Sequence, residues 1–220
     1  MFSLSTKSFK VSFEGNISAG KSTVFNYIKE LNVEGLSFVD EPVDEWLQIK
    51  DKDGNNALEC FYKNQKNNSF PFQVLAYITR LKKLIEKINS NPNNIIISER
   101  CIETDKYVFA RMLYENGNIS SFEWETYNYW YNSFSELSKV DLIIYIDTDP
   151  KICHQRIKKR NRTEELDIPL AYLENCDLKH KEWLSGTQTN VIKINGNDSI
   201  DAIKLNVENI LLNLKIEKQC

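Results

Sequence analysis

The sequence predicts an α/β fold in which a five-stranded parallel sheet is flanked by helices. Short apolar runs that are continuous, and not alternating, are typical of strands buried on both faces of a parallel sheet. Segments with apolar residues at helical spacing separate these runs, and strands that alternate with helices form parallel sheets. At 220 residues the chain suits one domain with a sizeable core, so we expect a single domain over residues 1–220.

The expected elements follow one another along the whole chain. The strands are residues 9–13, 36–39, 95–98, 142–146 and 191–194. Helical patterns cover residues 21–31, 72–88, 104–114, 122–137, 150–159, 169–184 and 200–214. Proline opens two of these helices, at Pro150 and Pro169, and proline suits the first helical turn. Residues 51–56 are polar and turn-like, which indicates a surface loop.

Composition excludes several classes of protein. Hydrophobic residues make up 41% and charged residues 27% of the chain, and its net charge of -3 argues against a nucleic-acid partner. No apolar run approaches the length of a membrane span. The five cysteines have no metal-ligand spacing, which indicates free thiols in a reducing compartment. The N-terminus leaves no room for a signal peptide before the first strand, so we expect a cytoplasmic enzyme.

A phosphate-binding loop follows the first strand. Residues 15–22 read GNISAGKS, which matches GxxxxGK[ST] between a strand and a helix. Its glycines allow backbone N–H groups to face phosphates, and the helix N-terminus adds a favourable dipole. Lys21 is expected to reach the β- and γ-phosphates of ATP and Ser22 to ligate Mg²⁺. The residues expected to bind the nucleotide are Gly15, Asn16, Ile17, Ser18, Ala19, Gly20, Lys21, Ser22 and Thr23.

Charged residues follow two further strands. Glu41 comes after the second strand, and Glu99 and Arg100 come after the third. Ligands of open α/β sheets bind beyond the carboxyl ends of the strands. One carboxylate there can accept the proton of a hydroxyl, another can hold Mg²⁺, and an arginine can offset charge on a moving phosphoryl group. The alternative is that these residues only cap helices. The phosphate loop in the same sequence favours the catalytic interpretation over this alternative.

A basic segment follows the fourth strand. Residues 156–162 read RIKKRNR, with Glu164 and Glu165 close behind. Such a helix and loop would present several cations to the phosphates of ATP, as a kinase lid does, and we expect the lid at about residues 158–168. The alternative is a solvated basic helix face. Asp147 also ends a strand, but Glu99 is the better metal candidate.

These motifs, in this order, resemble the deoxynucleoside kinase family, and most closely its deoxycytidine and deoxyguanosine kinase branch. The resemblance covers nearly the whole chain. It rests on EGNISAGKST at 14–23, EPVDEW at 41–46, FPFQ at 70–73, ERCIETDKYVF at 99–109, YENGNISSFEWETYNYWYNSF at 114–134, RNRTEELDIPLAYL at 160–173 and LAYLENCDLKHKEWL at 170–184. It implies a kinase that transfers the γ-phosphate of ATP to the 5′-hydroxyl of a deoxynucleoside.

The resemblance also implies roles for individual residues. Glu41 would be the general base, Arg100 would contact the same 5′-oxygen, and Glu99 would help to hold Mg²⁺. Tyr62 and Glu165 would bind the 3′-hydroxyl. The base would lie against Trp46, Phe72 and Phe109 and pair with Gln73, and the ATP phosphates and adenine would meet Arg156, Arg160, Arg162, Asn197 and Asp198. Without the resemblance, core packing explains the aromatic residues equally well.

Arg80 and Asp105 narrow the choice of base. Within the family, an arginine and an aspartate at these positions mark the deoxycytidine and deoxyguanosine branches, and such a pair crowds a thymine methyl group. The alternative is a purely structural ion pair. Residues 114–124 resemble the deoxyguanosine branch most, which favours purine deoxynucleosides slightly over deoxycytidine. Cys101 and Asn68 depart from the family pattern and can alter the shape of the pocket.

Two rival functions remain open at this point. A nucleoside monophosphate kinase shares the fold, but Glu41 would repel the phosphate of its acceptor. A non-catalytic nucleotide-binding regulator conflicts with the intact set of Lys21, Ser22, Glu41, Glu99 and Arg100. The resemblance further implies a homodimer built on the helices at 104–114 and 122–137, and feedback inhibition by a deoxynucleoside triphosphate.

Overall fold

The fold is a parallel five-stranded sheet, as expected. In the computed structural model, residues 8–160 and 162–219 are described; residues 1–7, 161 and 220, which include one expected lid position and the last cysteine, lie outside the described residues. The strands are β1 (Lys10–Glu14), β2 (Leu36–Val39), β3 (Ile95–Glu99), β4 (Leu142–Asp147) and β5 (Asn190–Asn195). They lie in the order β2-β3-β1-β4-β5, and every pair is parallel.

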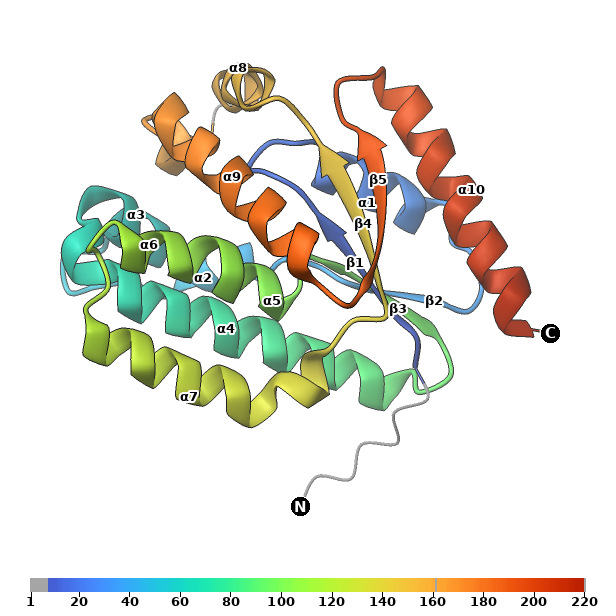
Figure 1. The fold of residues 1–220 in the computed structure, drawn as a ribbon, viewed down its shortest axis with the longest axis horizontal. Coiled ribbons are helices and arrows are strands. Elements are labelled where there is room, and N and C mark those ends of the chain that lie inside the picture. The colour runs from blue at the N-terminus through green and yellow to red at the C-terminus, as the bar shows by residue number, and fades with distance from the viewer. Residues whose placement is uncertain (1–7, 161, 220) are drawn as a thin grey trace.

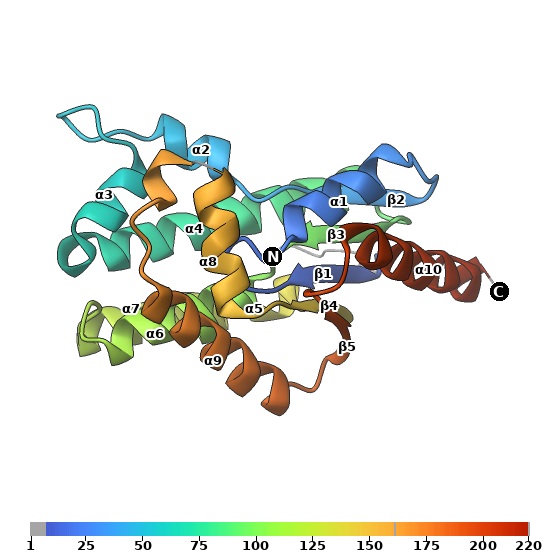
Figure 2. The same ribbon diagram turned by 90° about the horizontal axis from the view of Figure 1, so that it is seen from above.

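Helices cover both faces of this sheet (Figures 1 and 2). On one face, α1 (Lys21–Glu30) and α10 (Ile200–Gln219) pack on apolar side chains of β1 and β4. On the other face lie α4 (Gln65–Ser90), the short α5 (Ile102–Thr104), the π-helix η1 (Asp105–Ala110) and α9 (Leu170–Gly186). The helix α6 (Arg111–Glu115) continues η1 directly, and α7 (Ser121–Ser138) forms an outer layer beside α4.

The remaining helices gather at the carboxyl ends of the strands (Figure 2). They are α2 (Val43–Gln48), α3 (Ala57–Lys63), α8 (Pro150–Arg160) and the 3₁₀ turn η2 (Thr163–Glu165). The register pairs Phe13 with both Glu99 and Ile144, so β1, β3 and β4 end at one edge. Residues that follow these strands are therefore brought together.

The region between β2 and β3 contains more helix than the sequence analysis predicted. The helices α2 and α3 were not expected, although a capping box of Asn56 and Glu59 starts α3. The helix α4 begins at Gln65 and runs through Pro71, whereas we expected it to start at Phe72. Pro71 lies past the first turn of α4, so the helix forgoes one backbone hydrogen bond there. The earlier start is capped by Asn64, whose side chain accepts a hydrogen bond of 3.3 Å from the backbone N–H of Asn67.

Candidate active site

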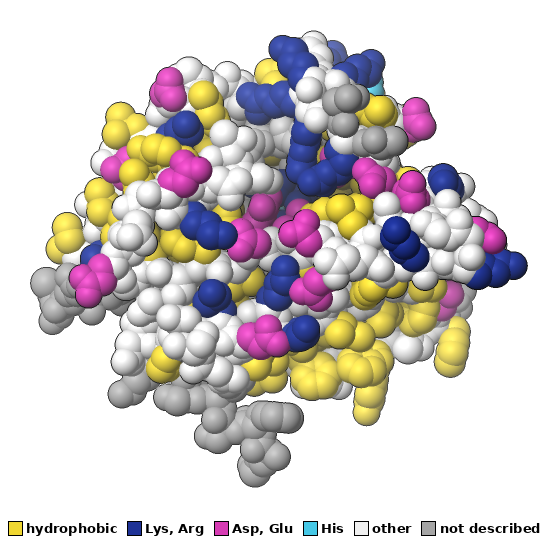
Figure 3. All heavy atoms as spheres, turned by 180° about the vertical axis from the view of Figure 1, so that it is seen from behind, with side chains coloured by type: hydrophobic (Ala, Val, Ile, Leu, Met, Phe, Trp, Pro, Cys, Tyr) yellow, Lys and Arg dark blue, Asp and Glu magenta, His cyan; other side chains and the backbone are white. Residues whose placement is uncertain are grey.

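A cavity of about 520 Å³ opens at the carboxyl ends of the strands, between the phosphate loop, α2–α4, η1 and the lid segment. Lys and Arg side chains gather around this hollow, with acidic side chains at its floor (Figure 3). Most of the residues singled out from the sequence line it: Ile17, Ser18, Ala19, Gly20, Lys21, Ser22, Thr23, Glu41, Trp46, Tyr62, Phe72, Gln73, Arg80, Glu99, Arg100, Asp105, Phe109, Arg156, Arg160, Arg162 and Glu165.

Four of the expected residues are not part of the lining. Gly15 and Asn16 begin the phosphate loop but do not line the cavity, and Asn16 Nδ2 donates to the carbonyl oxygen of Leu173 at 2.8 Å. Asn197 and Asp198 lie in the exposed turn after β5; Asn197 Oδ1 accepts a hydrogen bond from the backbone N–H of Asp149. Seven further residues line the cavity and were not singled out: Asn26, Val43, Leu58, Phe61, Ala76, Tyr172 and Ile200.

The phosphate loop has the backbone geometry that its glycines allow. Gly15 has φ +145°, and a Cβ there would lie 2.6 Å from the carbonyl oxygen of Ile146. Gly20 has φ +107°, which also disfavours a side chain. Lys21 Nζ lies within the loop and donates to the carbonyl oxygens of Gly15 at 2.9 Å and Asn16 at 2.6 Å. Burial, with Arg100 nearby, lowers the pKa of Lys21 to about 8.

Thr148 and Arg156 form a brace of hydrogen bonds that holds the C-terminal part of the phosphate loop. The carbonyl oxygen of Ala19 accepts hydrogen bonds from Thr148 Oγ1 and from the Arg156 guanidinium, both at 3.0 Å. The same guanidinium donates to the carbonyl oxygen of Gly196 at 3.2 Å. A Cβ on Gly196 would lie 1.9 Å from Thr148 Oγ1, so only glycine fits there. Arg156 therefore joins the phosphate loop to the turn after β5.

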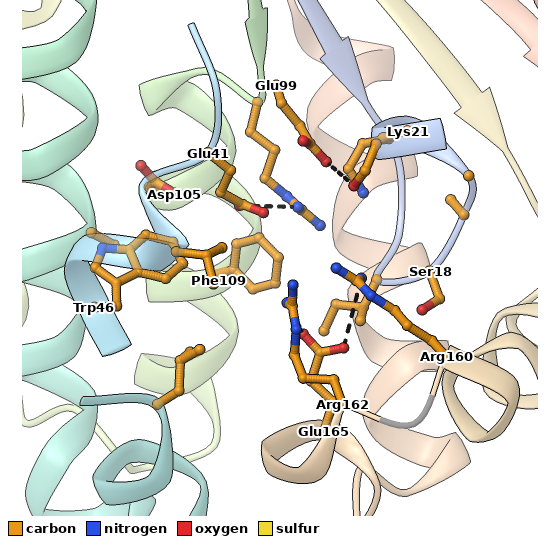
Figure 4. A pocket seen from close by; sticks show the side chains of 18 of the residues that line it. Ser18, Lys21, Glu41, Trp46, Glu99, Asp105, Phe109, Arg160, Arg162 and Glu165 are labelled. Atoms are coloured by element: carbon orange, nitrogen blue, oxygen red, sulfur yellow. Dashed lines mark hydrogen bonds and ion pairs between the residues drawn. The ribbon is translucent and has the colours of Figure 1, made fainter. Parts of the chain in front are cut away.

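Two arginines meet the carboxylate of Glu41. Arg100 Nη1 lies 3.3 Å and Arg80 Nη2 3.2 Å from Glu41 Oε1 (Figure 4). Arg80 also binds Asp105, with Nε 2.8 Å from Oδ2, and donates to the carbonyl oxygen of Glu99. Burial alone would raise the pKa of Glu41, but Arg100 and Arg80 outweigh it and lower the pKa to about 2. Glu41 is therefore an ionised hydrogen-bond acceptor at neutral pH.

Ser22 and Glu99 bring a hydroxyl oxygen and a carboxylate oxygen together next to Lys21. Ser22 Oγ donates to Glu99 Oε1 at 2.5 Å, and burial together with Glu41 raises the pKa of Glu99. In the part of the chain that the structure describes, no cluster of three or more acidic, His or Cys side chains could hold a metal. One hydroxyl and one carboxylate nevertheless fit Mg²⁺, which keeps several waters and takes its other ligands from phosphates.

Aromatic side chains enclose the end of the cavity away from the phosphate loop. Phe72 stacks on Phe61 at a centroid distance of 4.7 Å and meets the edge of Trp46 at 5.3 Å. Trp46 is held in place because its Nε1 donates to Thr79 Oγ1 at 3.0 Å. On the opposite wall, the Arg100 guanidinium lies 5.1 Å from the centroid of Phe109. These flat surfaces suit a planar ring.

Several buried polar atoms of this cavity have no hydrogen-bond partner among the described residues. They are Ser18 Oγ, Gln73 Oε1, Arg100 Nε and Glu165 Oε2. Buried polar atoms are nearly always paired in folded proteins, because an unpaired one costs about 1–3 kcal/mol. Their grouping along one cavity indicates that a polar ligand completes it.

Two arginines of the lid segment pair with a carboxylate of the same segment. Glu165 Oε1 lies 2.7 Å from Arg162 Nη1, and Oε2 lies 3.8 Å from Arg160 Nη1 (Figure 4). The neighbouring Glu164 accepts a hydrogen bond of 3.2 Å from Asn56 Nδ2 at the start of α3. Cations, the 3₁₀ turn and α3 thus meet over the mouth of the cavity.

Comparisons with known proteins agree with this geometry. Residues 11–217 match the family model described as deoxynucleoside kinase. The chain belongs to the deoxynucleoside kinase family. A fowlpox virus (strain NVSL) protein named as a probable deoxycytidine kinase is 40% identical over 201 residues, which cover 87% of this chain and 81% of the viral protein.

Vertebrate members of the family are also similar. Human deoxycytidine kinase is 36% identical over 199 residues, covering 81% of this chain and 76% of the human protein. Mitochondrial deoxyguanosine kinase of Xenopus laevis is 31% identical over 217 residues, covering 90% and 81% of the two chains. As a deoxynucleoside kinase, the protein is an ATP-dependent nucleoside kinase. Among its described residues, none of the helices is long and apolar enough to cross a membrane.

Glu14 organises the catalytic strand ends of this kinase and was not singled out from the sequence. It is fully buried and accepts hydrogen bonds from the Cys101 backbone N–H at 2.8 Å, from Thr104 Oγ1 and from Ser12 Oγ. These contacts hold the turn after β3, where Arg100 adopts φ +66°. A charged residue that ends an apolar strand directly before the phosphate loop is the signal that could have identified it.

Proposed function

We propose that this kinase phosphorylates the 5′-hydroxyl of a deoxynucleoside whose base is a purine or cytosine. The observation that carries the proposal is the base end of the cavity. There, the unpaired Gln73 Oε1 and the Arg80–Asp105 pair lie among flat aromatic side chains. An amide beside a guanidinium–carboxylate pair offers donors and acceptors to an amino-bearing ring.

The purine preference expected from residues 114–124 and a preference for deoxycytidine are both kept as candidates. The deoxycytidine candidate is favoured by the names of the fowlpox and human relatives, at 40% and 36% identity. The Xenopus deoxyguanosine kinase supports the purine candidate at 31% identity. The Arg80–Asp105 pair disfavours thymidine in either case, because a buried ion pair leaves little room for a methyl group.

In the proposed reaction, Glu41 accepts the proton of the 5′-hydroxyl while Arg100 contacts the same oxygen. A weak base suffices, because in a loose phosphoryl-transfer transition state the attacking oxygen needs to lose its proton only late. Lys21 and the loop N–H groups hold the donor phosphates, and Arg160 and Arg162 of the lid add positive charge. Mg²⁺, held by Ser22 and Glu99, would offset the phosphate charge.

The sugar and the lid complete the proposal. Following the family resemblance, we assign Tyr62 and Glu165, which both line the cavity, to the 3′-hydroxyl. Residues 158–168 are proposed to close over the phosphates as part of one kinase domain that spans the chain. Feedback inhibition by a deoxynucleoside triphosphate, a cytoplasmic location and a role in deoxynucleoside salvage belong to the same proposal.

A homodimer is proposed on the outer layer of helices. On α7, Phe122, Tyr129 and Trp130 are exposed by 81%, 76% and 44%, and on α4 Ile78 is exposed by 44%. Hydrophobic side chains gather on this side of the molecule, at the lower right of Figure 3. Exposed apolar side chains that gather on one face mark association surfaces. Sedimentation that shows only monomer at micromolar concentration would contradict the dimer.

A substrate panel tests the proposed acceptor. The four natural deoxynucleosides and their 5′-monophosphates are offered with ATP and Mg²⁺, and the products are separated by chromatography. We expect turnover of deoxycytidine, deoxyguanosine or deoxyadenosine, with kcat/KM for thymidine at least about tenfold lower, the size of a lost specific contact. Turnover of monophosphates alone would contradict the proposal.

A further inference from the structure

A second cavity lies on the far side of the helix that lines the active site. It has a volume of about 530 Å³, within the range of roughly 300–1,000 Å³ that is typical of small-ligand pockets. Its walls come from η1 and its flanking turns, from the last part of α7 and from the end of α9. In the part of the chain that the structure describes, none of its lining residues lines the active-site cavity.

One helical segment separates the two cavities. Glu103, Tyr107 and Arg111 recur at intervals of four residues and line the second cavity. Asp105 and Phe109, on the opposite side of the same segment, line the active site. A ligand in the second cavity would therefore contact the helix that carries Asp105.

The second cavity contains a buried acceptor without a partner. Glu103 Oε2 has no hydrogen-bond partner among the described residues, as is the case for Gln73 Oε1 and Glu165 Oε2 in the active site. Burial raises the pKa of the Glu103 carboxyl to about 7. Lys10 on β1 opposes this rise through its positive charge, but it does not line the cavity. A donor that reached Glu103 from the cavity would remove the cost of this unpaired oxygen.

Aromatic faces surround this carboxyl and already attract one cation. Tyr107 stacks on Trp183 at a centroid distance of 6.4 Å, and Tyr131 meets the edge of Tyr107 at 5.9 Å. Lys106 Nζ lies 3.9 Å from the centroid of Tyr131 and 5.2 Å from that of Tyr107. Such rings bind planar cations through their electron-rich faces.

The other charges of the cavity lie towards its rim. Glu182 is engaged by Lys179 at 2.9 Å, and Arg111 Nε by Glu115 at 2.8 Å. Glu136 near the end of α7 and Lys139 directly after it are both exposed and offset one another in charge. Glu103 thus offers a buried carboxyl oxygen to a ligand, and it is mainly ionised above its pKa of about 7.

We propose that this second cavity binds a small planar aromatic ligand with cationic N–H groups, which Glu103 anchors beside the rings of Tyr107, Tyr131 and Trp183 that line the cavity. Amidinium and guanidinium groups on an aromatic ring have this chemistry. The site is separate from the donor and acceptor sites of the kinase reaction.

Benzamidine is the probe that tests the proposal on the full-length protein. Its binding is measured by calorimetry and by the fluorescence of Trp183, with benzoate as the control of equal shape and opposite charge. We expect saturable binding of benzamidine and none of benzoate. The Glu103→Gln variant should lower the affinity for benzamidine by about tenfold or more, since it removes a charge-assisted hydrogen bond. The Trp183→Phe variant should lose the fluorescence change while the calorimetric affinity remains within about threefold, because Phe keeps an aromatic face.

Two further variants test whether benzamidine binds in the second cavity and not in the active site. Glu41→Gln alters only the active site and should leave the benzamidine affinity unchanged. Ser135→Trp fills the second cavity from α7 and should abolish binding, with thermal unfolding used to verify that each variant is folded. Absence of binding to the wild type, binding that survives both Glu103→Gln and Ser135→Trp, or binding lost in Glu41→Gln would each overturn the proposal. None of these measurements depends on kinase activity, so failure of the proposed function would leave the result readable.

Discussion

The two ends of the active-site cavity are built in different ways. At the phosphate end, residues 15–23 supply backbone groups from one continuous segment, and Thr148 and Arg156 brace that segment from beneath. At the acceptor end, side chains from α4, from η1 and from the segments that follow β2 and β3 form one network of charges. The phosphate end thus depends on local backbone shape, whereas the acceptor end depends on each charge keeping its partners.

This contrast predicts that a single substitution lowers the free energy of unfolding most when it removes a charge from the acceptor end. Arg80 and Asp105 are exposed by only 4% and 3%. Arg80→Met leaves the carboxylate of Asp105 buried without its cation, which should lower the free energy of unfolding by about 3–5 kcal/mol. Equilibrium unfolding in urea measures this loss of unfolding free energy. The double variant Arg80→Met/Asp105→Leu should regain at least half of the loss.

A matched exposed pair is the control. Lys29 and Asp40 are 2.8 Å apart with side chains about half exposed, so Lys29→Met should cost less than about 1 kcal/mol. A loss at Arg80→Met no larger than that at Lys29→Met would show that the acceptor network does not stabilise the fold.

Removal of the proposed base tests the chemistry at the acceptor end. Glu41→Gln keeps the shape of the side chain but cannot take a proton. The value of kcat should fall by about 10²-fold or more, the size expected of a general base. Steady-state kinetics with the preferred deoxynucleoside measures it, and an unchanged kcat would remove Glu41 from this role.

The brace of the phosphate loop can be broken at a glycine. In Gly196→Ala, the new Cβ would meet Thr148 Oγ1 at 1.9 Å and force this hydroxyl away from the carbonyl oxygen of Ala19. We expect a loss of about 1–3 kcal/mol in unfolding free energy and weaker ATP binding. Gly186→Ala is the control, because a Cβ there meets no atom within 4 Å. Equal losses in the two variants would argue against the brace.

The charge of Lys21 gives the phosphate end a pH dependence. The pKa of Lys21 is lowered from 10.5 to about 8, so the free enzyme loses this positive charge as the pH rises above 8. Between pH 8 and 9.5 the Kd for ATP should rise by about tenfold per pH unit, since only the protonated form attracts the phosphates fully. Calorimetric titration measures this slope. Lys21→Met should bind ATP weakly at every pH and show a flat profile, and an equal slope in this variant would assign the dependence to another group.

The outcome of the sequence predictions follows the same division between the two ends. The five parallel strands were predicted because their apolar runs are continuous, and each lies within one or two residues of its expected bounds. The phosphate loop was predicted because its chemistry lies in consecutive residues. The helices α2 and α3 were missed, since both are too short to show a clear helical period, and Pro71 argued for a later start of α4.

The sequence by itself determined the α/β class, the phosphate loop and the family. Hydrophobic periodicity and contiguous motifs depend only on residues that are close together in the chain. Only the tertiary structure decided which distant charges meet. It placed Arg80 between Glu41 and Asp105, buried Glu14 under the turn after β3, and left Glu103 Oε2 without a hydrogen-bond partner among the described residues. Burial and pairing arise from the packing of segments far apart in the chain, and those two properties set the charge state and the function of each group.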